Sequence, residues 1–292
     1  MYQERGLKRL GLTLAADLLI IAFCGVFFAI GRLVLLSSAG NGAEQGVRLP
    51  VIMYHSIYSG TPGDYIVTPE QAESDLRWLK DHGYTAVSAE EVIEYTEGHG
   101  ELPEKPVMIT LDDGFYNCLS EYLPLLEKYD MCAVMAIVGK YTDDLAPADP
   151  HIPSYSYLTW NDVKELYDSG RIEIASHTYD MHSLKGRRKG CMIAAGESDD
   201  DYREALSADI SLLQKAVYSR IGVSPKVFAY PFGGISRQSI PVLRSCGIRM
   251  TLTCYEKPNM ITHDPDCLYG ICRYNRSGLY STEQFMKKLT GE

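Results

Sequence analysis

Several familiar sequence features are missing from this chain of 292 residues. No Cys-x-x-Cys pair occurs, which argues against a zinc site built from cysteines. No Gly-x-Gly-x-x-Gly motif occurs, which argues against a dinucleotide-binding fold. Basic residues are outnumbered by acidic ones, 28 to 38, and residues 1–40 carry four basic against two acidic residues, so the remainder is more acidic still. A chain with this charge is a poor candidate for binding nucleic acid.

Cysteines are few, and they are odd in number outside the N-terminal segment. Of the eight, Cys24 lies in that segment, which leaves seven, so at least one thiol has no partner. Cys254, Cys267 and Cys272 cluster near the C-terminus. One pair among these three is a candidate disulfide, and the sequence leaves open which pair it is.

Only one long apolar run occurs, Leu10–Gly31. It has 22 residues, enough to span a bilayer, and three basic residues precede it. This pattern predicts a single-pass anchor with a cytoplasmic N-terminus and an extracytoplasmic remainder. The small residues around Ala39 indicate an alternative, a cleaved signal peptide and a secreted protein, although the length of the run favours the anchor. We expect a membrane anchor in residues 1–36, a Gly- and Ser-rich linker in 37–48 and one domain in 49–292.

The domain alternates short apolar runs with helical patterns, which is typical of a mostly parallel sheet. Capping boxes at Thr68–Gln71 and Ser88–Glu91 predict two helix starts. The polar stretch Lys185–Asp201 is expected to be a mobile loop beside the site. The expected strands are Val51–Tyr54, Thr85–Val87, Val107–Leu111, Cys132–Val138, Ile172–Ser176, Val227–Tyr230, Arg249–Thr253 and Tyr269–Tyr274. The predicted fold is α/β, a closed or nearly closed (β/α) barrel of seven or eight strands.

Two acidic residues follow directly on the apolar run Val107–Leu111. The run indicates a buried strand, and Asp112, Asp113 and Gly114 come next. Barrels of this class place their chemistry at the carboxyl ends of their strands. Adjacent strand residues point to opposite faces, but Gly114 permits a turn. One carboxylate would then face a metal, and the other would lie beside it near a water.

A second apolar run, Ile172–Ser176, leads into two histidines, His177 and His182. Residues five apart point in different directions on a helix, so these side chains must come from a strand end and the loop after it. Two histidines, one aspartate and a spare carboxylate suit metal-activated hydrolysis. A glycosidase would instead need two carboxyls that face each other, usually from different strands.

A third strand end carries the turn Phe228–Gly234. Pro231 has no N–H, and the two glycines after Phe232 permit a tight bend. The N–H of Tyr230 would then be free to point into the site, where an amide-cleaving enzyme needs a donor for its oxyanion. An ordinary turn is the alternative.

Together the three motifs resemble those of the polysaccharide deacetylases, the family 4 carbohydrate esterases. Thr-Leu-Asp-Asp-Gly is similar to their Thr-Phe-Asp-Asp motif, and His-Thr-Tyr-Asp-Met-His to their His-Ser/Thr motif. Phe-Ala-Tyr-Pro-Phe-Gly is similar to a variant of their Arg-Pro-Pro-Tyr motif. The resemblance covers residues 49–289 and implies a distorted, seven-stranded (β/α) barrel.

The resemblance also implies a role for each motif residue. Asp112 is the expected general base. Asp113, His177 and His182 are the expected ligands of a Zn²⁺ ion, or of another divalent transition metal such as Co²⁺. The backbone of Tyr230 is expected to stabilise the oxyanion.

Several positions depart from the commonest pattern of the family. The histidines are five rather than four apart, and Val51-Ile-Met-Tyr-His55-Ser supplies an opening Tyr-His motif. Both features resemble the branch that acts on poly-β-1,6-N-acetylglucosamine. The family's Arg before the third motif, its Asp-x-x-Asp-Trp motif and its Leu-x-His motif are absent. We expect Arg273 to replace the missing arginine and His55 to act as the general acid, with His263 a weaker alternative.

The sequence thus predicts a metal-dependent hydrolase that removes N-acetyl groups from a cell-surface polymer of N-acetylglucosamine, either peptidoglycan or poly-N-acetylglucosamine. Its expected partners are this glycan and, through residues 10–31, the cell membrane; no nucleic acid or nucleotide is expected. Two alternatives stay open: a glycan-binding module that has lost catalysis, and a glycosidase on the same barrel.

Overall fold

The computed structural model describes residues 46–145 and 151–291. The predicted membrane anchor, residues 10–31, and the cleavage site near Ala39 lie outside the described residues. Within the described ranges, no helix is both long and apolar enough to cross a membrane. The first strand, β1 (Val47–Leu49), begins inside the predicted linker, so the folded part of the chain includes the last two linker residues.

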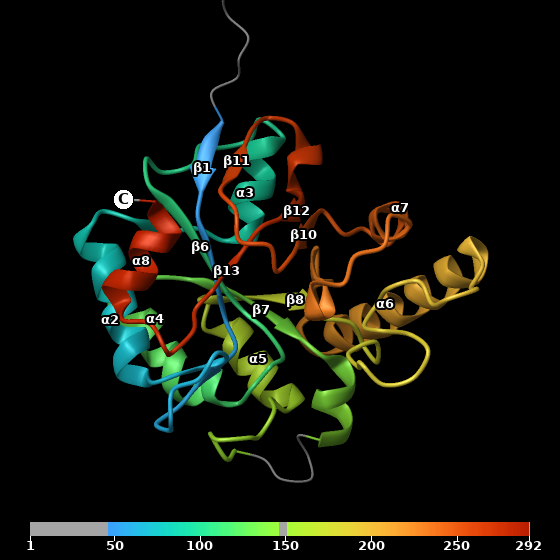
Figure 1. Cartoon of the computed structure of the whole chain (residues 1–292), viewed down its shortest axis with the longest axis horizontal. Coiled ribbons are helices and arrows are strands. Elements are labelled where there is room, and N and C mark those ends of the chain that lie inside the picture. Colours follow the sequence, from blue (N-terminus) through green and yellow to red (C-terminus); the bar gives the residue numbers. More distant parts are fainter. Residues whose placement is uncertain (1–45, 146–150, 292) are drawn as a thin grey trace, which may run out of the picture. The chain divides into compact units, whose positions relative to one another are not determined.

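A parallel sheet forms the centre of the domain (Figure 1). Its strands are β2 (Val51–Tyr54), β5 (Thr85–Ala86), β6 (Pro106–Leu111), β7 (Ala133–Ile137), β8 (Ile172–Ser176), β9 (Val227–Ala229), β10 (Met250–Leu252), β12 (Tyr269–Ile271) and β13 (Tyr274–Asn275). Their order is β12-β10-β9-β8-β7-β6-β2-β13, with β5 beside β6, and every pairing is parallel. The predicted strands are confirmed to within one residue, except that the last one is divided into β12 and β13.

The last two strands lie at the two edges of the sheet, and a short segment links them. β12 and β13 stand at opposite ends of the strand order, yet only Cys272 and Arg273 separate them in the chain. This short link brings the two edges of the sheet near each other, although no pairing joins β12 to β13 among the described residues. The predicted α/β fold is confirmed, as an incomplete barrel of nine strands instead of the expected seven or eight. Arg273 lies at the junction with its side chain fully buried. This position brings a cation from the C-terminal end of the chain into the barrel.

The helices lie outside the sheet (Figure 1). They are α2 (Pro69–Asp81), α3 (Ala89–Thr96), α4 (Leu123–Tyr129), α5 (Trp160–Asp168), α6 (Asp199–Ile221), α7 (Ser239–Ser245) and α8 (Thr282–Thr290). Thr68 and Ser88 cap α2 and α3 with complete capping boxes, as predicted. Ser198 caps α6, so the end of the predicted loop 185–201 is the first helical turn instead. Its three consecutive aspartates favour a helix N-terminus.

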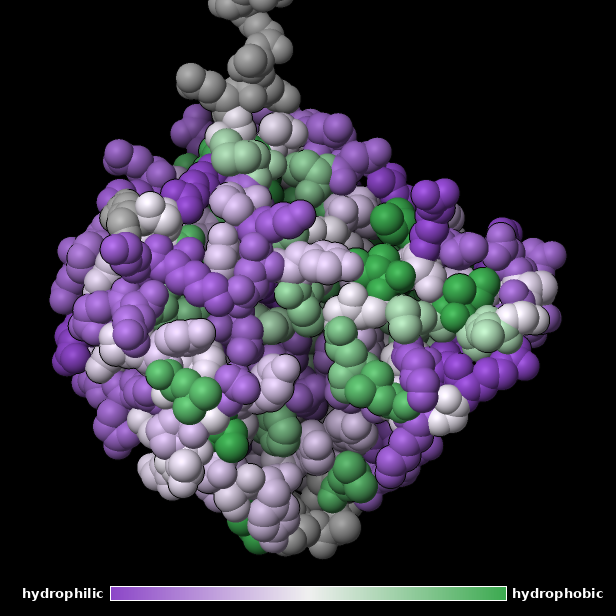
Figure 2. Space-filling view, viewed as in Figure 1, coloured by the Kyte–Doolittle hydropathy of each residue, from purple (hydrophilic) through white to green (hydrophobic). Residues whose placement is uncertain are grey.

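Short elements complete the fold. Two small sheets pair β1 with β11 (Asn259–Ile261) and β3 (Ser56–Ile57) with β4 (Ile66–Val67). Four helical turns are η1 (Cys118–Tyr122), η2 (Tyr141–Leu145), η3 (Pro231–Gly233) and η4 (Pro265–Leu268). On the face seen in Figure 2, hydrophilic residues dominate and hydrophobic residues form small separate groups.

The seven cysteines of the described residues are all free thiols. The candidate disulfide among Cys254, Cys267 and Cys272 is therefore not formed. Their sulfurs have other neighbours, since Cys254 Sγ lies 3.9 Å from Met53 Sδ and Cys272 Sγ lies 3.6 Å from the Gly270 carbonyl oxygen.

Candidate active site

A cavity of about 570 Å³ opens at the carboxyl ends of the parallel strands. His55 follows β2, Asp112 and Asp113 follow β6, His177 follows β8 and Phe232 lies in the turn after β9; all of them line the cavity. The strand ends named in the sequence therefore converge on one space, as expected for the functional end of a (β/α) barrel.

The chain turns sharply at each of the three motifs. Asp113 has a φ of 73° and Gly114 one of 78°, so the strand has ended before the second carboxylate. Thr178, next to the first histidine, has a φ of 73°, and Phe232 one of 57°. Residues with side chains seldom adopt this left-handed conformation, and such strain gathers at functional sites.

Both histidines of the second motif present Nε2 to Asp113. Nδ1 of His177 donates to the carbonyl oxygen of Ala229 at 2.9 Å, and Nδ1 of His182 lies 3.1 Å from the hydroxyl of Tyr141. That hydroxyl donates to the carbonyl oxygen of His182 at 3.2 Å, so its oxygen accepts from Nδ1. The ring proton is thereby on Nδ1 in each case. Burial lowers the pKa of His182 to about 4, which keeps this ring neutral at pH 7.

Asp113, His177 and His182 form a cluster that fits a divalent metal ion. The two Nε2 atoms lie 3.6 and 3.3 Å from Asp113 Oδ1, and the three ligand atoms all lie within 4.8 Å of one another. Two neutral imidazoles and one carboxylate leave coordination positions for water and substrate. The carbonyl and hydroxyl partners of the Nδ1 atoms are the supporting contacts that metal-binding histidines have. Among the described residues, no other group of three His, Cys, Asp or Glu side chains lies close enough together to share an ion.

Asp112 does not belong to this cluster, because Arg273 holds it. Nη1 and Nη2 of Arg273 donate to the two carboxylate oxygens at 2.7 Å each, and both side chains are buried. Burial alone would raise the pKa of Asp112, but the charge and the hydrogen bonds of Arg273 outweigh it and hold the pKa well below the usual range. Nε of Arg273 donates in turn to the carbonyl oxygen of Thr253 at 2.9 Å. Arg273 therefore supplies a buried cation to Asp112, and its replacement of the family's missing arginine stays a prediction.

His55 lines the cavity at the end of β2. Burial lowers its pKa, although the charges of Asp112 and Asp113 act in the opposite direction. Its Nδ1 is buried and has no hydrogen-bond partner among the described residues. His263, the weaker candidate for the acid, bonds the carbonyl oxygen of Tyr95 through Nδ1 at 2.8 Å and does not line the cavity.

The prediction of a free N–H at Tyr230 is wrong. This N–H donates to the carbonyl oxygen of Leu252 at 3.0 Å, because the pairing of β9 with β10 continues one residue past the end of β9. Pro231 has no N–H, and the two glycines after Phe232 donate within the turn. The N–H of Phe232 is used neither by the strand pairing nor by the turn, and this residue lines the cavity.

Asp209, a residue outside the three sequence motifs, holds the loop between the two histidines. Its carboxylate accepts from the N–H of Tyr179 at 2.7 Å and from the N–H of Asp180 at 2.8 Å. Asp209 therefore fixes the segment that sets the five-residue spacing. The signal in the sequence is an acidic residue on the buried face of the long helix α6.

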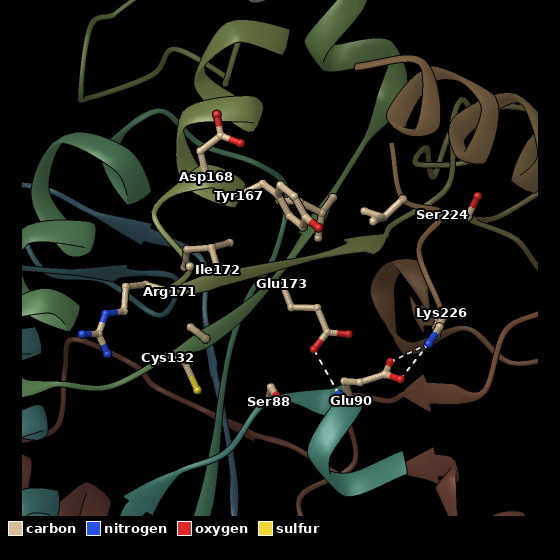
Figure 3. A pocket seen from close by; sticks show the side chains of 14 residues that line it. Ser88, Glu90, Cys132, Tyr167, Asp168, Arg171, Ile172, Glu173, Ser224 and Lys226 are labelled. Atoms are coloured by element: carbon tan, nitrogen blue, oxygen red, sulfur yellow. Dashed lines mark hydrogen bonds and ion pairs between the residues drawn. The ribbon is translucent and has the colours of Figure 1, made fainter. Parts of the chain in front are cut away.

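A second cavity, of about 630 Å³, lies among residues at the amino ends of β7, β8 and β9 (Figure 3). There Glu173 accepts from the N–H groups of Ala89 at 2.9 Å and Glu90 at 3.2 Å, at the start of α3, and Lys226 pairs with Glu90 at 2.7 Å. Burial raises the pKa of Glu173 to about 6. No histidine lines this cavity. The carboxylate of Glu173 accepts hydrogen bonds from the first turn of α3.

Comparison with known proteins identifies the family. The family model for polysaccharide deacetylases matches residues 99–251, a range that includes the aspartate, histidine and Tyr-Pro-Phe motifs. The chain belongs to this family. Its α/β fold, its candidate metal cluster and its motif order fit a polysaccharide deacetylase.

Individual relatives cover different parts of the chain. A poly-β-1,6-N-acetyl-D-glucosamine N-deacetylase of Escherichia coli (strain K12) is 30% identical over 196 residues, which is 60% of this chain and 29% of that protein. The enzyme of the same name from Staphylococcus aureus (strain MRSA252) is 26% identical over 194 residues, which is 66% of this chain and 63% of that protein. The chain therefore spans less than two thirds of either relative.

Solved structures show the same architecture. A de-N-acetylase from Aggregatibacter actinomycetemcomitans superposes with a TM-score of 0.70 at 25% identity, covering 83% of this chain and 100% of that one. A Streptococcus pyogenes deacetylase in complex with acetate superposes with a TM-score of 0.66 at 22% identity, covering 84% of this chain and 99% of that one; this second likeness supports the fold alone.

Proposed function

We propose that this protein is a metal-dependent N-deacetylase of N-acetylglucosamine polymers, with poly-β-1,6-N-acetylglucosamine as the preferred substrate. The observation that carries the proposal is that two adjacent aspartates, Asp112 and Asp113, contact different partners. Asp113 faces two histidines, whereas Asp112 is held ionised by Arg273. A protein that only bound a metal would need the first arrangement and not the second. Relatives named as poly-β-1,6-N-acetyl-D-glucosamine N-deacetylases support this polymer as the substrate over peptidoglycan.

The proposed reaction is hydrolysis of an acetamide to acetate and a free amine. Asp113, His177 and His182 would hold the ion, for which Zn²⁺ or Co²⁺ is suited; when bound, it supplies Lewis acidity to the acetamide carbonyl and to the attacking water. Asp112 accepts the proton of that water, and its low pKa keeps it ready to do so at neutral pH. His55 donates a proton to the leaving nitrogen.

We assign the oxyanion donor to Phe232 in place of Tyr230. The N–H of Tyr230 is engaged in the sheet, Pro231 has none, and the next N–H along the chain belongs to a residue that lines the cavity. A backbone donor at this position would stabilise the negative oxygen that forms when water adds to the carbonyl carbon.

The alternative functions gain no support from the cavity. Among the described residues, the carboxylates that line it are Asp112 and Asp113. These are neighbours on one strand end, whereas a glycosidase needs carboxyls on opposite sides of the scissile bond. Loss of catalysis would leave no reason to hold Asp112 ionised beside the cluster.

We further propose that residues 10–31 anchor the protein in the cell membrane, with the domain on the extracytoplasmic side. Secretion after cleavage near Ala39 is the alternative. The mass of the purified protein distinguishes them, because an anchored protein keeps residues 1–39 and a secreted one lacks them.

Acetate release tests the proposed activity. The full chain, loaded with Zn²⁺ or Co²⁺, is incubated with oligomers of β-1,6-linked N-acetylglucosamine and with peptidoglycan fragments. We expect release from the β-1,6 oligomers, loss of release after chelation, and recovery when the metal is restored. Asp113→Asn serves as the matched control, because it alters the cluster and leaves Asp112 and Arg273 in place. Equal release with and without metal would refute the metal-dependent mechanism, and no release from any of these substrates would refute the function.

A further inference from the structure

Two large apolar side chains are exposed at the wall of the active-site cavity. Among the exposed large hydrophobic residues in the described part of the chain, Tyr65 and Phe232 are the two that also line this cavity, with 60% and 48% of their surface exposed. The ring of Tyr65 lies 4.8 Å from that of His55, and the ring of Phe232 lies 4.5 Å from that of His182. Tyr65 therefore lies beside His55, the expected general acid, and Phe232 lies beside His182, a candidate metal ligand.

The backbone that carries Tyr65 is fixed on both sides. Nδ2 of Asn275 donates to the carbonyl oxygen of Asp64 at 2.8 Å, and the N–H of Gly278 donates to the carbonyl oxygen of Gly63 at 2.9 Å. The carbonyl oxygen of Tyr65 itself accepts from the N–H of Ser56 at 3.1 Å. The loop is thus held to the segment after β13, although it lies at the surface.

The contact at Gly278 is especially close. A Cβ atom at this position would lie 2.1 Å from the carbonyl oxygen of Ile66, the residue after Tyr65. Glycine is therefore required for the two segments to approach. The exposed ring of Tyr65 adds nothing to the hydrophobic core. Because its backbone is already fixed, however, a ligand that binds to the ring does not have to order the loop first.

The ring of Tyr65 is also oriented. It meets the ring of His55 at an interplanar angle of 65°, an edge contact that leaves most of the tyrosine ring exposed. Aromatic faces carry partial negative charge and attract C–H groups that are slightly positive. A pyranose ring offers such C–H groups on its faces and hydroxyl groups at its rim.

We infer that Tyr65 is a stacking platform for the sugar unit adjacent to the one that loses its acetyl group. The inference rests on the proposed function, since it assumes an N-acetylglucosamine polymer in the cavity. It commits to a glycan because, among the described residues that line the cavity, the exposed large apolar side chains are two separate rings, whereas a protein partner would need a broad apolar patch. Tyr65 thereby selects substrates with at least two linked sugars.

Substrate length is the variable that exposes this role. A single N-acetylglucosamine has no neighbouring unit to stack, and an activated aryl acetate has no sugar at all. The Tyr65→Ala variant should therefore lose about tenfold in kcat/KM on a pentamer of β-1,6-linked N-acetylglucosamine, mainly through KM. It should lose less than about twofold on the monomer and on the aryl acetate. Tyr65→Phe keeps the ring and should retain wild-type length dependence.

Tyr218 provides the matched control. It is 61% exposed, lies on α6 and does not line the cavity, so Tyr218→Ala removes an equally exposed ring at a distance from the site. This variant should behave as wild type on every substrate. Binding of the pentamer to each variant, measured by titration calorimetry, gives a readout that does not depend on turnover.

The outcomes separate the two claims. If the wild type releases acetate and Tyr65→Ala weakens pentamer and monomer turnover equally, Tyr65 acts through His55 and the platform is refuted. Pentamer binding unchanged in Tyr65→Ala also refutes the platform, whatever the turnover. If the wild type binds the pentamer with dependence on Tyr65 but releases no acetate, the proposed reaction fails while the binding role stands.

Discussion

Replacement of Arg273 by glutamine tests how the general base is held. Arg273 is fully buried, and it contacts both carboxylate oxygens of Asp112 at 2.7 Å. Arg273→Gln would leave Asp112 buried without its main cation. Burial, the largest influence on this carboxyl, would then be unopposed except by more distant charges, so the pKa of Asp112 should rise from below its usual range to above it.

The size of the effect follows from the burial of the pair. Removing one partner of a buried ion pair typically costs about 3–5 kcal/mol, and one unit of pKa corresponds to about 1.4 kcal/mol. A depressed carboxyl pKa adds stability above the pKa of the unfolded chain, and this stability is lost as the pH falls through the folded pKa. Arg273→Gln removes that contribution at neutral pH. The acidic limb of kcat/KM should also move upward by at least about one pH unit.

The assay combines unfolding by denaturant with a pH profile of acetate release. Arg276→Gln is the matched control, because Arg276 lies on the same segment, is equally buried and donates to Asp75 through Nε at 2.6 Å. Both variants should lose stability, but only Arg273→Gln should shift the acidic limb. Asp112→Asn combined with Arg273→Gln should recover stability without activity, since it removes the unpaired charge. A loss of stability in Arg273→Gln with an unmoved acidic limb would refute the coupling of Arg273 to the base.

Three further predictions concern the metal, the acid and the opposite end of the barrel. Metal analysis of the purified protein should find that Asp113→Asn has lost its divalent ion and that Asp112→Asn has kept it; equal loss would contradict the division between the two acids. His55→Ala should keep the metal and slow hydrolysis of the amide by about 10²–10⁴-fold, with a smaller effect on an aryl acetate, whose leaving group needs no proton. Burial raises the pKa of Glu173 from 4.5 to about 6, so its contribution to stability is full below the unfolded pKa and is lost as the pH rises through about 6. Glu173→Gln should therefore be more stable than wild type by about 2 kcal/mol at pH 7 and lack this dependence, which denaturant unfolding at pH 4.5 and 7 would measure.

The meeting of the candidate metal ligands could be predicted because parallel strands bring their carboxyl ends to one place. Asp113 and His177 each follow an apolar run, so the barrel alone accounts for their meeting. The orientation of His182 could not be predicted in the same way. It depends on Tyr141, which accepts from Nδ1, and on Asp209, which holds the loop from a distant helix. Neither contact has a spacing that a sequence pattern reveals.

The error at Tyr230 has a definite physical cause. The expectation of a free N–H at Tyr230 assumes that strand pairing stops before this N–H, since proline follows. In the structure the ladder of β9 and β10 uses this N–H for Leu252, and the turn begins one residue later. A shift of one residue changes which N–H is available. The composition of a turn predicts that a bend occurs, but the last hydrogen bond of a parallel ladder depends on the register of its partner.

Part of the site comes from the segment after β12, which lies outside the range that the family model matches. The family model matches residues 99–251, yet the cation of the base, Arg273, comes later in the chain. The same segment contributes Asn275 and Gly278, which fix the loop of Tyr65. Because β12 and β13 lie at the two edges of the sheet, one stretch of chain links these edges, pairs Arg273 with Asp112 and holds the loop of the proposed sugar platform.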